Sequence, residues 1–324
     1  MILAGIDIGT NTLRLLIAEI GNGSFHEILS DRKIIRLGQS LDRTGRLSFD
    51  AVKRSLSTLA DFAKSIRSHA AIHVAAVGTS ALRNASNSAE YITIVKKRTG
   101  LAITVVSGEE EARLTLLGVT HVLQDCGFWN RIQPASALVI DIGGGSTEII
   151  MKYPGHETTI ASLPLGVVYL TERLIKHDPP LEEEIELLRR TIREELEKHG
   201  NVLVTDFPRN LVGTAGTITT LAAMDQNLSE YDPSKINGYA MTKDTVDGIV
   251  ARLIKSTIEE RKDIAGLEKG REDIILSGAV ITQEVMNHFG FSTMIVSDWG
   301  LREGIVFDLY EKVQKTSCGR STHN

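Results

Sequence analysis

One short pattern occurs twice in the chain and constrains its fold more than any other feature. Asp-Ile-Gly-Thr-Asn-Thr runs from Asp7 to Thr12, and Asp-Ile-Gly-Gly-Gly-Ser runs from Asp141 to Ser146. In both copies, apolar and polar residues alternate on either side of a turn of small and hydroxyl residues. This arrangement predicts two antiparallel strands joined by a tight turn. The duplication predicts two domains of the same ancestry, each with one such turn.

Length and composition agree with two globular domains. A chain of 324 residues is longer than one hydrophobic core usually serves, and 42% hydrophobic with 24% charged residues is typical of an α/β protein. The formal net charge of −5 argues against a protein that coats nucleic acid. A polyanionic ligand would therefore need a local site that creates its own positive potential.

The sequence predicts a cytoplasmic protein without a membrane partner. The opening residues, MILAGIDIGTN, lack a basic segment, and Gly5 and Asp7 interrupt the apolar run too early for a signal peptide or a membrane span. Only two cysteines occur, Cys126 and Cys318, and they lack the spacing of a zinc site or a disulfide framework. We interpret them as reduced thiols in the cytosol.

Strands and helices alternate along the chain. Apolar spacing of three to four residues predicts amphipathic helices over residues 50–70 and 181–199. A strand that ends at Val106 precedes a helix with three glutamates in its first turn. NLVGTAGTITTLAAM and EDIILSGAVITQEVM are each predicted to form a strand, a turn and a helix, and the segment MIVSDWGLREGIVFDLYEKV a strand, a loop and a final helix. This order predicts a layered α/β fold.

The repeated turns are candidate phosphate-binding sites. A turn rich in glycine and hydroxyl residues exposes successive backbone N–H groups, which form a concave anion site without any net charge. The alternative is a tight hairpin that needs glycine for positive φ, but two aspartate-led copies and a third glycine turn favour the anion site. The candidate residues are Thr10, Asn11, Thr12, Gly143, Gly144, Gly145, Ser146, Gly213, Thr214 and Gly216.

Three carboxylates accompany the turns. Asp7 and Asp141 directly precede them, where a carboxylate can hold a magnesium ion that bridges phosphate oxygens. Glu148 lies on the return strand after the second turn, at the parity opposite to Ile149, so it faces either the same cleft or bulk solvent. We therefore name Asp7 and Asp141 as candidate Mg²⁺ ligands.

Hydrolysis of a phosphoanhydride also needs a general base and a group that stabilises charge. Glu111 is our candidate base, although three glutamates at a helix start also stabilise the helix macrodipole without any catalytic role. Arg83, in the loop GTSALRNA, is a candidate phosphate clamp, and a surface salt bridge is its alternative.

These motifs together resemble the exopolyphosphatase and guanosine pentaphosphate phosphohydrolase (Ppx/GppA) family, within the superfamily of actin, Hsp70 and sugar kinases. The resemblance covers nearly the whole chain and rests on the order and joint presence of its pieces. They are GIDIGTNTLRLLIA, VGTSALRNA, VVSGEEEARL, LVIDIGGGSTEII, LPLGVVYLTE, LVGTAGTITTLAA, ILSGAVI and VSDWGLREGIV.

The resemblance implies two actin-like (ribonuclease-H-like) domains that close on an interdomain cleft. Residues 1–125 with a C-terminal helix at 300–324 would form the first domain, and residues 126–299 the second. It also implies a Mg²⁺-dependent enzyme of the stringent response that releases terminal phosphate from polyphosphate or guanosine pentaphosphate, and a homodimer. Longer members carry further C-terminal domains, so a short form would favour guanosine pentaphosphate or short chains, without any residue here that decides between them.

The resemblance assigns roles to individual residues. Glu111 aligns with the family's base, with Glu110 as a neighbouring acidic alternative. Asp141 and Glu148 match the acidic positions associated with the metal, which adds Glu148 to the candidate Mg²⁺ ligands. Arg83 matches the arginine that contacts phosphate. Two other functions remain open: a phosphotransferase of the same superfamily, and an actin-like switch protein that binds ATP.

Overall fold

The computed structural model describes residues 1–21, 24–125, 136–152, 156–200 and 210–320. It divides into two compact units, Met1–Gly118 with Gly300–Asn324, and Val119–Trp299. The division falls inside a helix, α5 (Gly108–Asp125), whereas the sequence placed the domain boundary after residue 125. Cys126 and the side chain of Cys318 lie outside the described residues.

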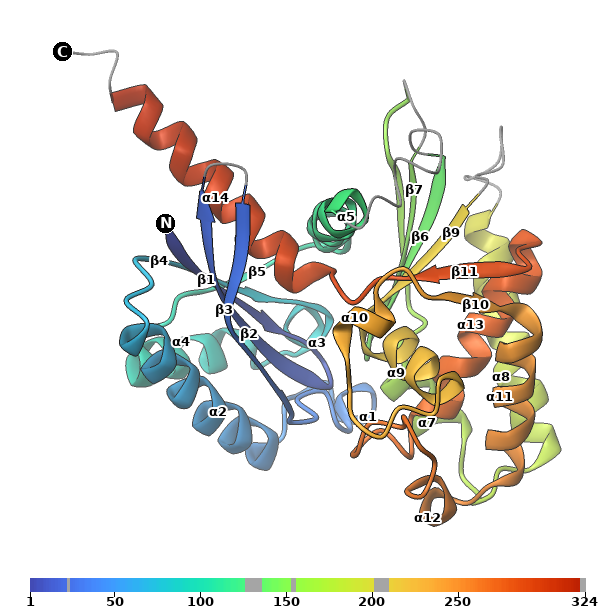
Figure 1. Ribbon diagram of the computed structural model, residues 1–324. Coiled ribbons are helices and arrows are strands. Elements are labelled where there is room, and N and C mark those ends of the chain that lie inside the picture. Colours follow the sequence, from blue (N-terminus) through green and yellow to red (C-terminus); the bar gives the residue numbers. More distant parts are fainter. Residues whose placement is uncertain (22–23, 126–135, 153–155, 201–209, 321–324) are drawn as a thin grey trace. The chain divides into compact units, whose positions relative to one another are not determined.

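The first unit is built on a five-stranded sheet in the order β3-β2-β1-β4-β5 (Figure 1). The strands are β1 (Ile2–Ile8), β2 (Thr12–Gly21), β3 (Ser24–Ile34), β4 (His73–Gly78) and β5 (Ile103–Val105). β1 and β2 form the predicted antiparallel hairpin, and β1 is parallel to β4. The apolar-rich β1 is buried along nearly its whole length because it lies at the centre of the sheet.

Helices cover both faces of this sheet. They are α1 (Leu41–Thr44), α2 (Phe49–Ser68), α3 (Ser80–Asn84), α4 (Ser88–Thr99), α5 and α14 (Leu301–Arg320). Ser48 caps α2, and the buried apolar side chains of α2 belong to the same hydrophobic cluster as Ile6 and Ile8. Gly5, which faces the other way, lies so close to α14 that a β-carbon there would be 2.7 Å from Cγ2 of Val306.

The second unit contains a six-stranded sheet in the order β10-β11-β9-β6-β7-β8. The strands are β6 (Ala137–Ile142), β7 (Thr147–Lys152), β8 (Thr159–Leu163), β9 (Asn210–Thr214), β10 (Ala240–Thr242) and β11 (Thr293–Val296). The helices are α7 (Val167–Leu174), α8 (Glu182–Gly200), α9 (Ala215–Asp225), α10 (Pro233–Ile236), α11 (Lys243–Lys255), α12 (Ile258–Arg261) and α13 (Ile275–Phe289).

The two sheets share a common core of four strands. In the first unit, β1 pairs antiparallel with β2, β2 antiparallel with β3, and β1 parallel with β4. In the second unit, β6, β7, β8 and β9 pair in the same order and directions. The pairing gives each position in one unit an equivalent in the other, so the duplication of the sequence is also a duplication of topology.

Two predicted elements are wrong. Arg83 was expected in a loop, but residues 80–84 form α3, which includes it. The segment EDIILSGAVITQEVM was expected to form a strand, a turn at Ser277 and Gly278, and a helix, but α13 already begins at Ile275 and includes both residues. The short apolar run Ile274–Leu276 fits a buried helix as well as a strand. Gly278 serves packing, because a β-carbon there would be 2.4 Å from Cγ2 of Thr217.

Candidate active site

The first repeated turn connects β1 to β2 and is fixed by its neighbours. The N–H of Gly9 donates to the carbonyl of Thr12 at 3.0 Å and closes the turn. The carbonyl of Thr10 accepts from Gly38 N–H at 2.8 Å, and the carbonyl of Asn11 accepts from two N–H groups of residues 35–36 at 2.9 Å. A β-carbon on Gly38 would be 2.4 Å from Cγ2 of Thr10, so only glycine allows this approach. The backbone of the turn is therefore held rigidly.

The side chain of Asn11 has a buried hydrogen-bond donor that a ligand could satisfy. Asn11 is 6% exposed, and its Nδ2 is buried without a hydrogen-bond partner among the residues that the structure describes. A buried donor without an acceptor costs about 1–3 kcal/mol and needs an explanation. An oxygen atom of a bound phosphate would satisfy it, and Thr10 and Thr12, which are also buried, flank it in the same turn.

The second turn, Gly143 to Ser146, repeats the first. Gly143 N–H donates to the carbonyl of Ser146 at 3.0 Å, the bond that Gly9 makes in the first unit. The start of α7 supports this turn, since Val167 N–H donates to the carbonyl of Gly143 at 3.1 Å and Val168 N–H to that of Gly144 at 2.9 Å.

Gly166 allows the backbone before α7 to approach the second turn closely. Among the described residues, the glycines with positive φ do not include the three in this turn, so the alternative of a left-handed hairpin does not account for them. A β-carbon on Gly166, just before α7, would be 2.2 Å from the carbonyl carbon of Gly145. The turn is therefore packed directly against backbone.

The third turn lies between β9 and α9. The hydroxyl of Thr214 donates to the carbonyl of Trp299 at 2.9 Å, and Ser297 N–H donates to the carbonyl of Gly213 at 2.8 Å. Ala215 has a φ of 72°, a left-handed conformation that costs a residue with a β-carbon about 1–2 kcal/mol. Strain of this kind persists only where the surroundings fix it, and it is frequent at ligand-binding sites.

Arg271 is a basic residue at this third turn that the sequence analysis missed. Arg271 is 4% exposed. A β-carbon on Gly216 would be 2.2 Å from Nη2 of Arg271, so the guanidinium lies against the turn. Glu268 accepts from Nε of Arg271 at 2.5 Å. Because Arg271 lies far from Gly216 in sequence and belongs to no recognisable motif, only the tertiary fold could show that the two are adjacent.

Four polar residues of the second unit, two of them carboxylates, lie side by side on four adjacent strands. Asp141 on β6 lies directly opposite Glu148 on β7, Glu148 lies opposite Ser162 on β8, and Thr214 on β9 lies beside Asp141. Residues that are opposite one another in a sheet share a face. Asp141 is 7% exposed and Glu148 only 1%, so of the two orientations left open for Glu148, that toward bulk solvent is excluded.

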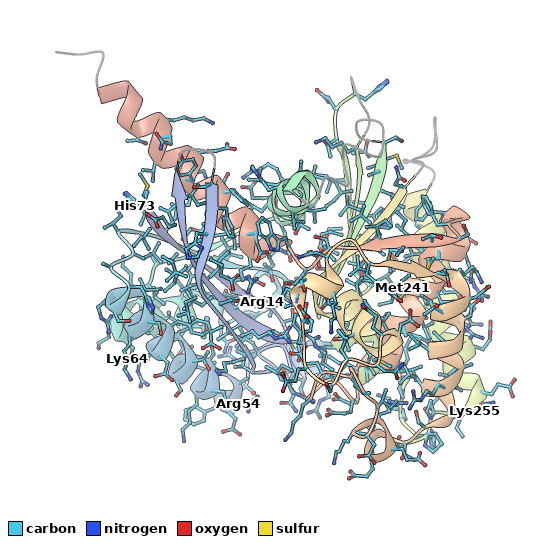
Figure 2. All side chains as sticks on the ribbon, in the orientation of Figure 1. Arg14, Arg54, Lys64, His73, Met241 and Lys255 are labelled. Carbon is cyan, nitrogen blue, oxygen red and sulfur yellow. The ribbon has the colours of Figure 1, made fainter. Side chains whose placement is uncertain are left out.

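The equivalent row in the first unit carries the opposite charge. Asp7 on β1 lies opposite Arg14 on β2, and Arg14 lies opposite Arg32 on β3 (Figure 2 labels Arg14). Asp7 Oδ2 is 3.9 Å from Nη1 of Arg14. The position of Glu148 in one unit thus corresponds to Arg14 in the other, and that of Ser162 to Arg32.

This difference in charge between the two rows makes Asp141 and Glu148 better candidate metal ligands than Asp7. Two buried carboxylates directly opposite one another repel, so the pair Asp141 and Glu148 fits a cation, and Mg²⁺ is usually held by one or two carboxylates together with substrate phosphates. No group of three or more acidic, His or Cys side chains suited to a metal occurs in the described part of the chain, so substrate and water would complete such a site. Asp7 already has a guanidinium opposite it, which fits a metal less well.

The candidate base and the candidate clamp are in direct contact. Arg83 Nη1, on α3, donates to Oε2 of Glu111 at 2.6 Å and to the carbonyl of Val106 at 3.0 Å. Glu111 is 8% exposed, and the side chain of Arg83 is 21% exposed. Arg83 therefore forms no ordinary surface salt bridge: its partner is the buried carboxylate at the start of α5.

The three glutamates of α5 have different surroundings. The hydroxyl of Ser107 accepts from Glu110 N–H at 3.1 Å and caps the helix. Arg113 donates two hydrogen bonds to the carboxylate of Glu110, at 2.7 and 2.8 Å, and these bonds lower the pKa of Glu110 although partial burial opposes them. Glu109 is exposed, which leaves Glu111 as the buried member of the three.

Two equivalent α/β units, each with the same tight turn between its first two strands, define a protein of the actin-like class. The family model of the Ppx/GppA phosphatase family matches residues 16–313. The chain belongs to this family. No helix in the described residues is long and apolar enough to span a membrane.

Individual relatives agree with the family match. Exopolyphosphatase 2 of Mycobacterium tuberculosis is 34% identical over 95% of this chain and 98% of its own length. The crystal structure of the Aquifex aeolicus member of the Ppx/GppA family is 35% identical with a TM-score of 0.79, and the match covers 97% of this chain and 98% of that one. An exopolyphosphatase from Cytophaga hutchinsonii is 29% identical with a TM-score of 0.88, over 96% and 98% of the two chains.

Proposed function

We propose that this protein is an exopolyphosphatase that releases the terminal phosphate of inorganic polyphosphate, with Glu111 as the general base. The observation that carries the proposal is the buried carboxylate of Glu111 held at 2.6 Å by Arg83. A base in a site of low dielectric can be oriented toward one water molecule, as anhydride hydrolysis requires. Relatives named exopolyphosphatase that match nearly the whole chain support the substrate.

The remaining groups divide between binding and charge stabilisation. The turn at Asn11 and the glycine turn at Gly143 to Ser146 offer N–H donors to phosphate oxygens. Asp141 and Glu148 would hold Mg²⁺, which neutralises charge on the phosphate when it is bound. Arg83 stabilises the charge that develops on the transferred phosphoryl group.

The chemical step is a simple hydrolysis. Water attacks the terminal phosphorus, the bond from this phosphorus to the bridging oxygen breaks, and the proton of the water passes to Glu111. The products are orthophosphate and a chain one phosphate shorter. Both units contribute groups to this scheme.

Guanosine pentaphosphate is the second candidate substrate. The name of the family supports it, and its terminal phosphoanhydride presents the same chemistry to the turns and to Glu111. Family membership does not favour the phosphotransferase alternative. A cytoplasmic location is proposed because two cysteines in 324 residues fit a reducing compartment. The homodimer implied by the sequence resemblance stays a prediction.

A single assay tests the proposal. Phosphate release is measured with Mg²⁺ on long polyphosphate, short polyphosphate, guanosine pentaphosphate and ATP, for the wild type, Glu111→Gln and Glu110→Gln. Because a general base contributes about 10²–10⁴-fold, Glu111→Gln should lose at least ~100-fold in kcat, while its neighbour Glu110→Gln stays within a few fold. Loss in Glu110→Gln instead would move the base to Glu110, and release from ATP alone would refute the exopolyphosphatase.

A further inference from the structure

Glu148 is more deeply buried than Asp141, the carboxylate opposite it on the neighbouring strand. It lies on β7 between Asp141 on β6 and Ser162 on β8, and it is 1% exposed. A glutamate has three side-chain torsions, and repulsion from Asp141 favours any rotamer that moves its carboxylate away. A metal ligand in this position therefore needs a group that fixes its orientation.

Ser162 provides such a group. Its hydroxyl donates to Oε1 of Glu148 at 2.8 Å, and it lies on the side of β7 opposite to Asp141. β8 is the edge strand of the sheet and Ser162 itself is exposed, so the hydroxyl is not there to fill the core. In the first unit, Arg14 stands at the position equivalent to Glu148, and Arg32 at the position equivalent to Ser162.

We propose that Ser162 is a positioning residue that holds the carboxylate of Glu148 in the orientation that binds the divalent cation. The inference rests on the proposed function, in which Asp141 and Glu148 are the metal ligands. Hydrogen bonds to metal-binding carboxylates set the orientation of the ligand, and removing such a partner typically weakens metal binding about 10–100-fold. Ser162 acts through Glu148 and contacts no metal itself.

The test measures metal binding directly, with Mn²⁺ as the probe and without substrate. Free Mn²⁺ is followed by electron paramagnetic resonance for the wild type, Ser162→Ala, Ser162→Thr and Thr159→Ala. Ser162→Ala should raise the Kd for Mn²⁺ about 10-fold, and Ser162→Thr should restore it because the hydroxyl returns. Thr159 lies on the same strand but faces the other side, so Thr159→Ala controls for the loss of a hydroxyl from β8.

Two further measurements separate the ways in which the inference can fail. The Mg²⁺ concentration for half-maximal phosphate release should shift by the same factor as the Kd, and the unfolding midpoint in a chelator should stay constant. An unchanged Kd for Mn²⁺ with a raised KM for polyphosphate would assign the hydroxyl to the substrate and overturn the inference.

Asp141→Asn distinguishes this inference from the proposed metal site. If Asp141→Asn abolishes Mn²⁺ binding and Ser162→Ala does not change it, the metal site stands and only the role of Ser162 is wrong. If Asp141→Asn binds Mn²⁺ as the wild type does, or the wild type binds none either with or without added orthophosphate, the metal site itself fails, and the role of Ser162 fails with it.

Discussion

Arg83 links two parts of the candidate site through a single nitrogen, Nη1, which contacts both Glu111 and the carbonyl of Val106. Lysine keeps the positive charge but lacks the planar fork of the guanidinium. Arg83→Lys should therefore remain folded and lose about 100-fold in kcat, the typical cost of one transition-state donor. Steady-state kinetics together with the thermal midpoint check this. A wild-type kcat, or a loss of activity explained by unfolding, would remove Arg83 from the chemistry.

The residues of the site differ in how far sequence could predict them. Asp141 and Glu111 stand in local motifs with an evident chemical use, and alternation placed Glu148 on one of two faces. The choice between the faces needed the neighbouring strands, because exposure is a property of the sheet. Arg271 and the hydroxyl of Ser162 gave no local signal at all: their contacts with Gly216 and Glu148 depend on strand register and on loops far away in sequence.

At the scale of elements, the strongly periodic segments were predicted best. The helix expected over residues 181–199 is α8 (Glu182–Gly200), and both hairpins formed as expected. β3 (Ser24–Ile34) was not predicted, since it is an edge strand with mixed exposure on both faces and no clear alternation. α13 was mistaken for a strand at its start because it is buried all round, and a helix without a polar face lacks the period that identifies it.

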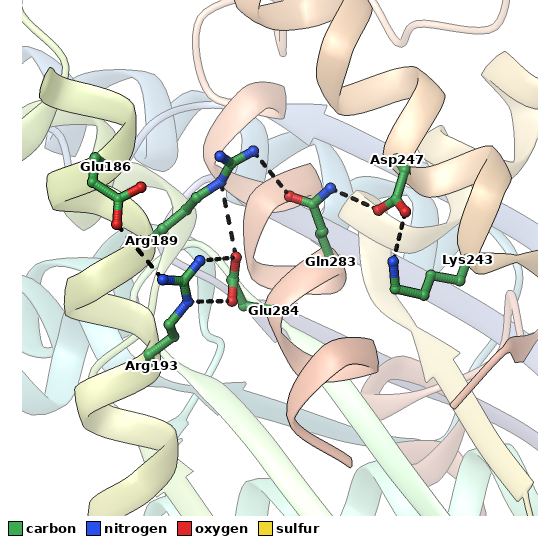
Figure 3. Close-up of polar contacts among 7 residues, drawn as sticks. All are labelled: Glu186, Arg189, Arg193, Lys243, Asp247, Gln283 and Glu284. Atoms are coloured by element: carbon green, nitrogen blue, oxygen red, sulfur yellow. Dashed lines mark hydrogen bonds and ion pairs between the residues drawn. The ribbon is translucent and has the colours of Figure 1, made fainter. Parts of the chain in front are cut away.

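α13 still carries charge, and one network ties it to its neighbours (Figure 3). Glu284, 3% exposed, accepts from Nε and Nη2 of Arg193 on α8 at 2.8 and 3.2 Å. The adjacent Gln283 donates to Asp247 on α11 at 2.7 Å. The same helix also contacts α7, whose start supports the turn at Gly143 to Ser146, because Ser277 bonds the hydroxyl of Thr171 on α7 at 2.7 Å.

Breaking this network should destabilise the second unit. Glu284→Gln leaves the guanidinium of Arg193 beside a neutral amide, and we expect a loss of about 2 kcal/mol in the free energy of unfolding, discounted because Arg193 is half exposed. Glu186 is the matched control: it pairs with the same arginine at 3.6 Å but its side chain is 62% exposed. Glu186→Gln should cost less than ~1 kcal/mol. Urea unfolding of both variants measures the two losses of stability. Equal losses would mean that the burial of Glu284 does not strengthen its ion pair.

At the scale of the whole molecule, the duplication was the most informative sequence feature, because a repeated hairpin implies a repeated topology. What the repeat could not predict is the specialisation of the copies. Asp7 and Asp141 look alike in sequence, but the strands beside them carry Arg14 and Arg32 in one unit and Glu148 and Ser162 in the other. The row of side chains beside Asp7 therefore suits an anion and that beside Asp141 a cation, and neither unit alone offers all the groups that hydrolysis needs.

This division of labour predicts that mutations in the two units will not be additive. Glu111→Gln removes the proposed base of the first unit and Asp141→Asn a proposed metal ligand of the second, and each should lower kcat/KM by at least ~100-fold. Groups that act as one catalytic unit give a double variant little worse than the poorer single one, whereas independent effects multiply. We therefore expect the double variant to lie within about 10-fold of the weaker single variant. Phosphate release from polyphosphate by the four proteins measures this, and fully multiplied losses would mean that the two units do not serve the same phosphate.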